Sequence, residues 1–436
     1  MPSSREPGKR GKAERERVAR AAPARSAWRV IGVSLALVIL LAGLVLLLPA
    51  RSQRGPAPVA AAGAARASAP TSAPASAPAP AQLASSARAA QLREQFELAD
   101  HSYCSYREGT RYPNASRPIA EHPDQVYPNR PVTESHPMRK DGGGTDPSVQ
   151  IHTAQTRIYL AAGEAATFTL AAFDADGRAL PLFVTRALAR ALTYREARAP
   201  APVALAFADD GRNGDAAAGD GAFSGVLAPA QSGLAGFSGT IRTEVKYSVG
   251  GRAGVVLFDV VYTAETPAVW GGQVREALEN GSLNFYLKLD VRQAGRYLAT
   301  GRIDDAKGRP FALASFNDTL AAGPNELRLT VFGKLLRDAE AALPLTLRDV
   351  DAYLLKENTD PDRALMARLE GPQHVSRSYP LKNFSDAEWQ GEERSRYLAE
   401  LGKDVAAARA ALLGADPALA AQAFARSECA RPGQSP

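Results

Sequence analysis

The chain has 436 residues, a formal net charge of +6 and two cysteines. The excess charge lies in residues 1–29, which carry nine Lys and Arg against three Glu, so the other 407 residues hold 43 basic and 43 acidic side chains. A body with no net charge lacks the electrostatic footprint of a phosphate-binding surface, which argues against nucleic acid as a partner.

An apolar run follows this basic tail. Residues Val30–Ala50 read VIGVSLALVILLAGLVLLLPA, without a charge, and about 20 such residues span a bilayer as a helix. Lys and Arg beside a span mark its cytoplasmic side. We therefore expect a single-pass signal anchor in a bacterial inner membrane, with residues 1–29 in the cytoplasm and the C-terminal body in the periplasm. A secretory signal, cleaved within the Ala-rich stretch that follows, is the alternative.

The next two segments contain few large aliphatic residues. Residues 51–90 are mostly Ala, Pro and Ser, which predicts a disordered linker. Residues 91–147 are predicted to start with a short helix, 91–100, and to continue as an extended strap, because closely spaced prolines forbid a longer helix. Four tyrosines are expected to pin this strap to the body: Tyr103, Tyr106, Tyr112 and Tyr127.

Short alternating strands separated by Gly and Asp turns dominate residues 148–358. For example, GTIRTEVKYSV and AGVVLFDVVYT flank Gly250 and Gly251, which indicates a hairpin. The segments from Ala162 and Ala294 share an order of Ala-Gly, strand, Asp turn and Gly-Arg. The pattern predicts a mainly β fold of two tandem Ig-like antiparallel β-sandwich domains, 148–264 and 265–358.

The C-terminal extension, 359–436, has a helical pattern. Ser385 and Glu388 have the spacing of a capping box, which predicts a helix from there to about Leu413. A second helix is expected from Pro417 to about Ser427, so that the two form a helical hairpin.

The cysteines, Cys104 and Cys429, both lie in the predicted exported part. Two thiols in an oxidising compartment favour a disulfide. Such a bond would return the C-terminus to the start of the body, whereas the alternative is a pair of buried, unpaired thiols.

An acidic loop is the most specific local feature. Within DDGRNGDAAAGDG, five side chains offer oxygen ligands: Asp209, Asp210, Asn213, Asp215 and Asp220. Calcium prefers six to eight oxygens on a flexible loop, so this stretch is a candidate calcium site. The alternative is a turn-rich connection in which Asp and Asn cap their own backbone. We expect no other cofactor.

The sequence DDGRNGDAAAGDGAFSGVL is similar to a stretch of choice-of-anchor X domains in bacterial surface proteins, as are RDVDAYLLKEN and SYPLKNFSDAEW further on. The resemblance covers roughly residues 150–401. It implies tandem Ig-like modules outside the cytoplasm, and it supplies no catalytic residues. Ala222 and Phe223 depart from the more usual Val/Ile-Tyr pair.

No catalytic arrangement is recognisable in the sequence. GFSGT from Gly236 is one residue short of a nucleophile elbow, and the five histidines lack the close pairs of a metal site. We therefore expect a non-enzymatic binding or adaptor protein whose partner is an unidentified envelope protein or polymer. The alternatives are an extracytoplasmic hydrolase acting on envelope polymer, with carboxylates from distant loops, and a structural spacer.

Overall fold

The computed structural model describes residues 80–193, 199–418 and 427–430. All of them belong to the second of two units of the chain, Pro78–Pro436. The predicted tail, the predicted span Val30–Ala50 and residues 51–79 of the predicted linker lie outside the described residues. Within the described part, no helix is both long and apolar enough to cross a membrane.

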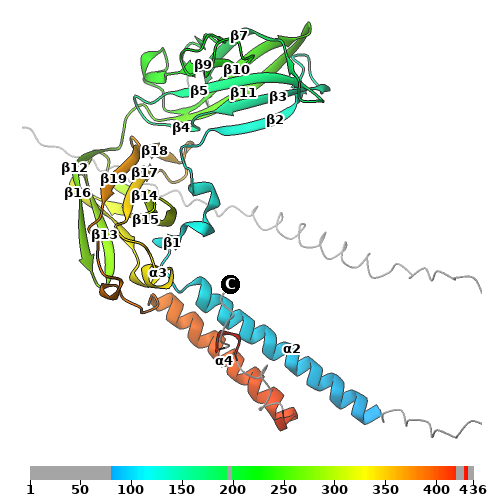
Figure 1. Cartoon of the computed structure of the whole chain (residues 1–436), viewed down its shortest axis with the longest axis vertical. Helices are drawn as coiled ribbons and strands as arrows, with labels where there is room; N and C mark the ends of the chain where they lie inside the picture. The colour runs from blue at the N-terminus through cyan, green and yellow to red at the C-terminus, as the bar shows by residue number, and fades with distance from the viewer. Residues whose placement is uncertain (1–79, 194–198, 419–426, 431–436) are drawn as a thin grey trace, which may run out of the picture. The chain divides into compact units, whose positions relative to one another are not determined.

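The described chain is mainly β, as predicted, and its strands form several largely antiparallel sheets (Figure 1). Two sheets belong to the first half of the body. The first has the order β2-β3-β5-β6, with β9 also paired to β5, and the second has the order β4-β11-β10-β7-β8. Their bounds are β2 Val132–Arg139, β3 Thr145–Gln155, β4 Tyr159–Leu160, β5 Ala166–Asp174, β6 Ala179–Leu180, β7 Leu182–Ala191, β8 Val203–Ala204, β9 Phe223–Leu227, β10 Gly239–Val249 and β11 Arg252–Tyr262.

One hydrophobic core lies between these two sheets. Every second residue of β10 is buried, so one face of the strand is apolar and packs inward. Phe168 from one sheet stacks on Phe258 from the other, with ring centroids 4.6 Å apart. The predicted hairpin is confirmed, because Val249 pairs with Arg252 across Gly250 and Gly251. Both glycines have positive φ, as a type I′ hairpin turn requires.

Two further sheets enclose a second core. One has the order β12-β13-β16, and the other has the order β1-β15-β14-β17-β18, with β19 also paired to β17. Their bounds are β1 Ser116–Pro118, β12 Ala268–Glu279, β13 Ser282–Val291, β14 Gly295–Asp304, β15 Pro310–Leu320, β16 Gly323–Val331, β17 Thr346–Leu355, β18 Arg363–Leu365 and β19 Leu369–Val375. The second core is built from the inward faces of these strands.

The strap contributes a strand to each sandwich. Its β1 pairs with β15 of the second sandwich, and its β2 forms the edge of a sheet in the first. Pro137 is tolerated within β2 because an edge strand needs partners on one side only. The expected pinning by tyrosines is wrong for Tyr127, whose side chain is 60% exposed.

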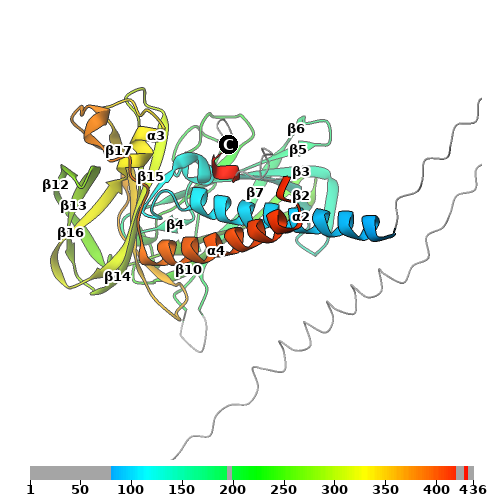
Figure 2. The same cartoon turned by 90° about the horizontal axis from the view of Figure 1, so that it is seen from below.

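Two long helices pack side by side (Figures 1 and 2), α2 (Pro80–Gly109) and α4 (Glu392–Ala415). A small apolar cluster of Leu92, Phe96 and Leu412 lies between them. The remaining short helices are η1 Ile119–Glu121, η2 Pro123–Gln125, η3 Pro229–Gln231, α3 Gly333–Asp338, η4 Leu381–Asn383 and η7 Glu428–Ala430.

The helical hairpin therefore differs from the prediction. A C-terminal helix is present, but it packs on α2, which lies about 300 residues earlier in the chain. The sequence predicts a linker up to residue 90 and a helix only over 91–100, whereas α2 runs from Pro80 to Gly109. Residues 419–426, which hold most of the predicted second helix, lie outside the described residues.

The predicted capping box is also wrong, because α4 begins at Glu392 with Gly391 as its N-cap. The Ser385 backbone amide donates to the carbonyl of Gly281, which holds Ser385 against the second sandwich instead. The carboxylate of Glu388 is engaged by arginine side chains, so it cannot reach back to a cap.

The predicted disulfide between Cys104 and Cys429 is present, with Cα atoms 5.4 Å apart. It ties the C-terminal η7 to α2. The backbone amide of Glu428 also donates to the carboxylate of Asp100, at 2.6 Å. Covalent and polar contacts together therefore return the C-terminal segment to the first helix.

We predict that removing the disulfide loosens α4 before it affects the sandwiches. A bond that closes a loop of this length contributes about 3 to 5 kcal/mol by restricting the unfolded chain, and the apolar cluster between the helices is small. In the double variant Cys104→Ser/Cys429→Ser, amide exchange should accelerate across α4 and stay unchanged in β10. Equal protection of the α4 amides against exchange in the variant and the parent would contradict this expectation.

Candidate functional site

The acidic loop lies between β8 and β9 in the first sandwich. An isolated bridge between Ala208 and Ser224 closes its base. Gly214 has a φ of 87°, and a Cβ at this position would lie 2.6 Å from the Thr167 side chain. The loop can therefore pack this closely on β5 only with glycine at position 214.

Backbone amides fix the carboxylates of this loop. Asp209 accepts hydrogen bonds from the amides of Gly219, Asp220 and Gly221, and so connects the two ends of the loop. Asp215 accepts through Oδ2 from the amide of Gly211, at 2.6 Å. These bonds hold the two carboxylates in place without neutralising their charge.

Three carboxylates converge in this arrangement. Asp209, Asp215 and Asp220 each place an oxygen within 4.8 Å of the others. Asp210 is not part of this group; its Oδ1 accepts from the amide of Arg212 instead. Asn213 has a φ of 49° and occupies a left-handed turn position. The structure thus brings together three of the five predicted ligand residues.

A groove of about 530 Å³ lies on the same sandwich, between the edges of its two sheets. One wall is β2, which pairs only with β3 among the described strands. The other wall is the middle of β11, where β4 reaches only Val261 and Tyr262. Both walls therefore present backbone groups of unpaired strand edges.

The groove is closed at both ends. At one end Lys140 bridges to Gly254, and at the other the side-chain amide of Gln155 donates to the carbonyl of Asp259. Five residue steps separate Gly254 from Asp259, which is roughly 17 Å of strand. Exposed apolar side chains contribute to the lining, among them Val132 and Ile158, which are 43% and 42% exposed. No sequence signal identified this groove, because its walls are 120 residues apart in the chain.

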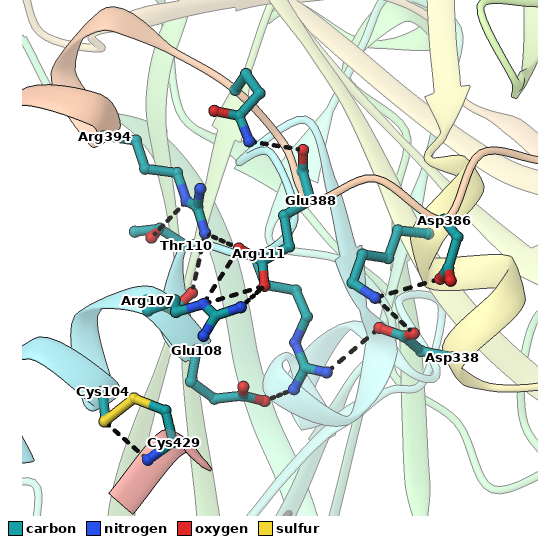
Figure 3. A network of polar contacts seen from close by, with 12 residues as sticks. Cys104, Arg107, Glu108, Thr110, Arg111, Asp338, Asp386, Glu388, Arg394 and Cys429 are labelled. Carbon is teal, nitrogen blue, oxygen red and sulfur yellow. Dashed lines mark hydrogen bonds and ion pairs between the residues drawn. A yellow bond between two sulfur atoms is a disulfide. The ribbon is translucent and has the colours of Figure 1, made fainter. Parts of the chain in front are cut away.

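A polar network joins the two long helices to the second sandwich (Figure 3). Glu388 binds the guanidinium groups of Arg107 on α2 and Arg394 on α4. The Arg394 side chain is only 3% exposed and also donates to Thr110. Burial opposes ionisation of Glu388, but hydrogen bonds from both arginines outweigh it and hold the pKa of the carboxyl below its ordinary value.

The same network continues to α3. Asp338 accepts hydrogen bonds from the side chains of Arg111 and Tyr112 and pairs with Lys334. Burial and the bond to Asp338 raise the pKa of Tyr112 to about 12, so this phenol stays a donor at physiological pH. These contacts fix the strap where it leaves α2.

Sequence reasoning missed a second buried charge cluster. Arg302 pairs with Asp304 and Asp349, and all three are at least 94% buried in their side chains. Arg302 also donates to the carbonyl of Val126, and Asn129 donates to Asp349, so the cluster anchors the strap. The charged residues of this cluster gave no sequence signal of burial; only the structure shows that the last four residues of β14, including Arg302 and Asp304, are all buried.

No family model and no curated protein matches the chain. Partial likenesses occur among solved structures. A DUF4785 family protein from Legionella pneumophila is 16% identical with a TM-score of 0.34, and the match covers 52% of this chain and 57% of that protein. Escherichia coli alpha-2-macroglobulin, activated by porcine elastase, is 12% identical (TM-score 0.19), with 51% of this chain and 20% of that one covered.

Fibronectin(III)-like modules of Clostridium thermocellum CbhA are 11% identical, with a TM-score of 0.18, and the match covers 48% of this chain and 84% of that one. At these values the likenesses carry no argument about activity or ligand.

We predict that Glu388 contributes more to stability than an exposed helix carboxylate. Glu388→Gln leaves Arg394 buried without its counter-charge, which should lower the free energy of unfolding by about 2 kcal/mol. Glu400→Gln is the matched control, because Glu400 pairs with Lys403 on the exposed surface of α4, and such a pair contributes less than about 1 kcal/mol. Urea unfolding, followed with a probe in the helices, measures the free energy of unfolding of both variants. An equal loss in Glu388→Gln and Glu400→Gln would contradict the predicted role of Glu388.

The pH dependence has a definite sign. Because folding lowers the pKa of Glu388 from its ordinary value of 4.5, its contribution is present above that pH and is lost as the pH falls through the folded-state pKa. Unfolding between pH 6 and about 3 should therefore show a steeper loss of helix-pair stability in the parent than in Glu388→Gln. Parallel curves for the two proteins would show that Glu388 is not the group responsible.

Proposed function

We propose that the chain is a membrane-anchored extracytoplasmic binding or adaptor protein of a bacterial envelope, and not an enzyme. The groove between the open edges of β2 and β11 is the observation that carries this proposal. Unpaired strand edges bind extended polypeptide by continuing the sheet, with backbone hydrogen bonds giving affinity and side-chain pockets giving selectivity.

The occupant that fits this groove is a short extended polypeptide segment. The free length of β11 allows about five residues of added strand. Val132 and Ile158 offer apolar contacts on the lining, while Glu134 and Arg139 of β2 supply one charge of each sign. A segment that alternates apolar and polar residues matches these features.

The proposed architecture places the groove outside the cytoplasm. We take the two cores to be tandem Ig-like sandwiches, in line with the resemblance to choice-of-anchor X domains. Val30–Ala50 would anchor the chain in the inner membrane, with the Ala-, Pro- and Ser-rich segment after it as a tether. The Cys104–Cys429 disulfide supports this location, because such bonds persist in oxidising compartments.

Peptide binding to the purified full chain in detergent tests the proposal. The probe is a fluorescent peptide of about five residues that alternates valine and threonine, and fluorescence anisotropy measures its affinity. We expect Ile158→Lys to weaken binding at least tenfold, because it places a charge on the apolar lining of the groove. Phe183→Lys is the matched control, since Phe183 is 65% exposed on β7 and does not line the groove.

Two outcomes would overturn the proposal. Equal binding by the parent and Ile158→Lys would remove the groove as the binding site. Cleavage of the peptide, or release of soluble fragments from isolated envelope polymer, would favour the hydrolase alternative instead.

A further inference from the structure

We propose that the acidic loop between β8 and β9 is a calcium site in which Asp209, Asp215 and Asp220 are the protein ligands. This inference is independent of the peptide groove, because it rests on the chemistry of the loop alone. The structure narrows the five candidate ligand residues of the sequence to three that share one location.

The Asp215 side chain supplies the decisive observation. Asp215 is 8% exposed, and its Oδ1 is buried without a hydrogen-bond partner among the described residues. A buried carboxylate oxygen without a partner costs free energy, and a charged one costs more. The Oδ2 atom is held by Gly211, so the carboxylate cannot turn away without losing that bond. A cation beside Oδ1 would supply the missing partner.

The local charge leads to the same conclusion. Three carboxylates have oxygens within 4.8 Å of one another, and like charges at that distance repel. None of the three forms an ion pair with a basic side chain in the part of the chain that the structure describes. A divalent cation at their centre converts this repulsion into attraction.

The donor set favours calcium over magnesium. Calcium accepts six to eight oxygens in flexible geometry, and three carboxylates supply between three and six of them. Magnesium requires a near-ideal octahedron and gives up its water reluctantly. The bonds from Gly219 and Gly221 to Asp209 pre-orient one ligand and draw the two ends of the loop together.

Isothermal titration of the full chain in detergent, after treatment with EDTA, tests the site with Ca²⁺ itself. We expect one calcium per chain. Asp220→Asn should lower the affinity at least about tenfold, since affinity follows the number of charged ligands. Because Asp220 is exposed, this change leaves the interior intact.

Asp215→Asn should abolish binding, and the melting temperature in EDTA shows whether that variant still folds. Asp210→Asn is the matched control, because it removes the same charge from the same loop at an exposed residue outside the group. It should bind like the parent.

Three results would overturn the proposal. The first is no binding by the parent at millimolar Ca²⁺. The second is an equal loss in Asp210→Asn and Asp220→Asn, which would indicate diffuse attraction to an acidic surface. The third is equal affinity for Mg²⁺, which would contradict the assignment to calcium.

Discussion

A clamp joins α2 to the C-terminal elements α4 and η7, and so holds together residues that are about 300 positions apart. Its components are the Cys104–Cys429 disulfide, a small apolar cluster, and Glu388 shared between Arg107 and Arg394. Because Arg394 is buried, the clamp forms only when helix, loop and counter-charge are all in place. The strap leaves this clamp at Tyr112 and then lies along one sandwich before it adds an edge strand to the other.

That path explains the location of the open groove. The strap supplies the edge strand β2, which forms an antiparallel hairpin with β3 and pairs with it on one side only. The buried cluster around Arg302 anchors the strap just before β2, at Val126 and Asn129. The buried charges around Arg302 in the second sandwich therefore fix the position of β2, whose outer edge in the first sandwich is unpaired. An open sheet edge is a place where another extended chain can pair.

Apart from the disulfide, which follows from the presence of two cysteines in a chain expected to be exported, the features predicted correctly from the sequence are local ones. The hairpin of β10 and β11 can be identified from the alternation of apolar and polar residues along both strands and from the Gly250-Gly251 turn. Side-chain direction and turn geometry are set within a few residues. The length of α2 could not be predicted, since Ala-rich sequence with little apolar periodicity resembles a disordered tether until another helix packs against it. The capping box at Ser385 failed because Glu388 binds Arg107, which lies 281 residues away in the chain.

The two candidate sites show the same difference between local sequence features and long-range contacts. The acidic loop was visible as a motif because its residues lie within twelve positions, but only folding separates Asp215, which is buried, from Asp210, which faces solvent. The groove left no trace in the sequence, since its walls come from distant strands. In both cases the residue types suggest the chemistry, and the long-range contacts decide which residues take part.

A disulfide between Cys104 and Cys429 requires an oxidising compartment, so the proposed location outside the cytoplasm and the clamp can be tested together. Bacterial cells that express the full chain are quenched with acid, and the precipitated protein is dissolved in neutral denaturant and treated with a mass-tagged maleimide before and after reduction. We predict that Cys104 and Cys429 react only after reduction, each adding one tag. Labelling of both thiols without reductant would contradict the clamp and the extracytoplasmic location together.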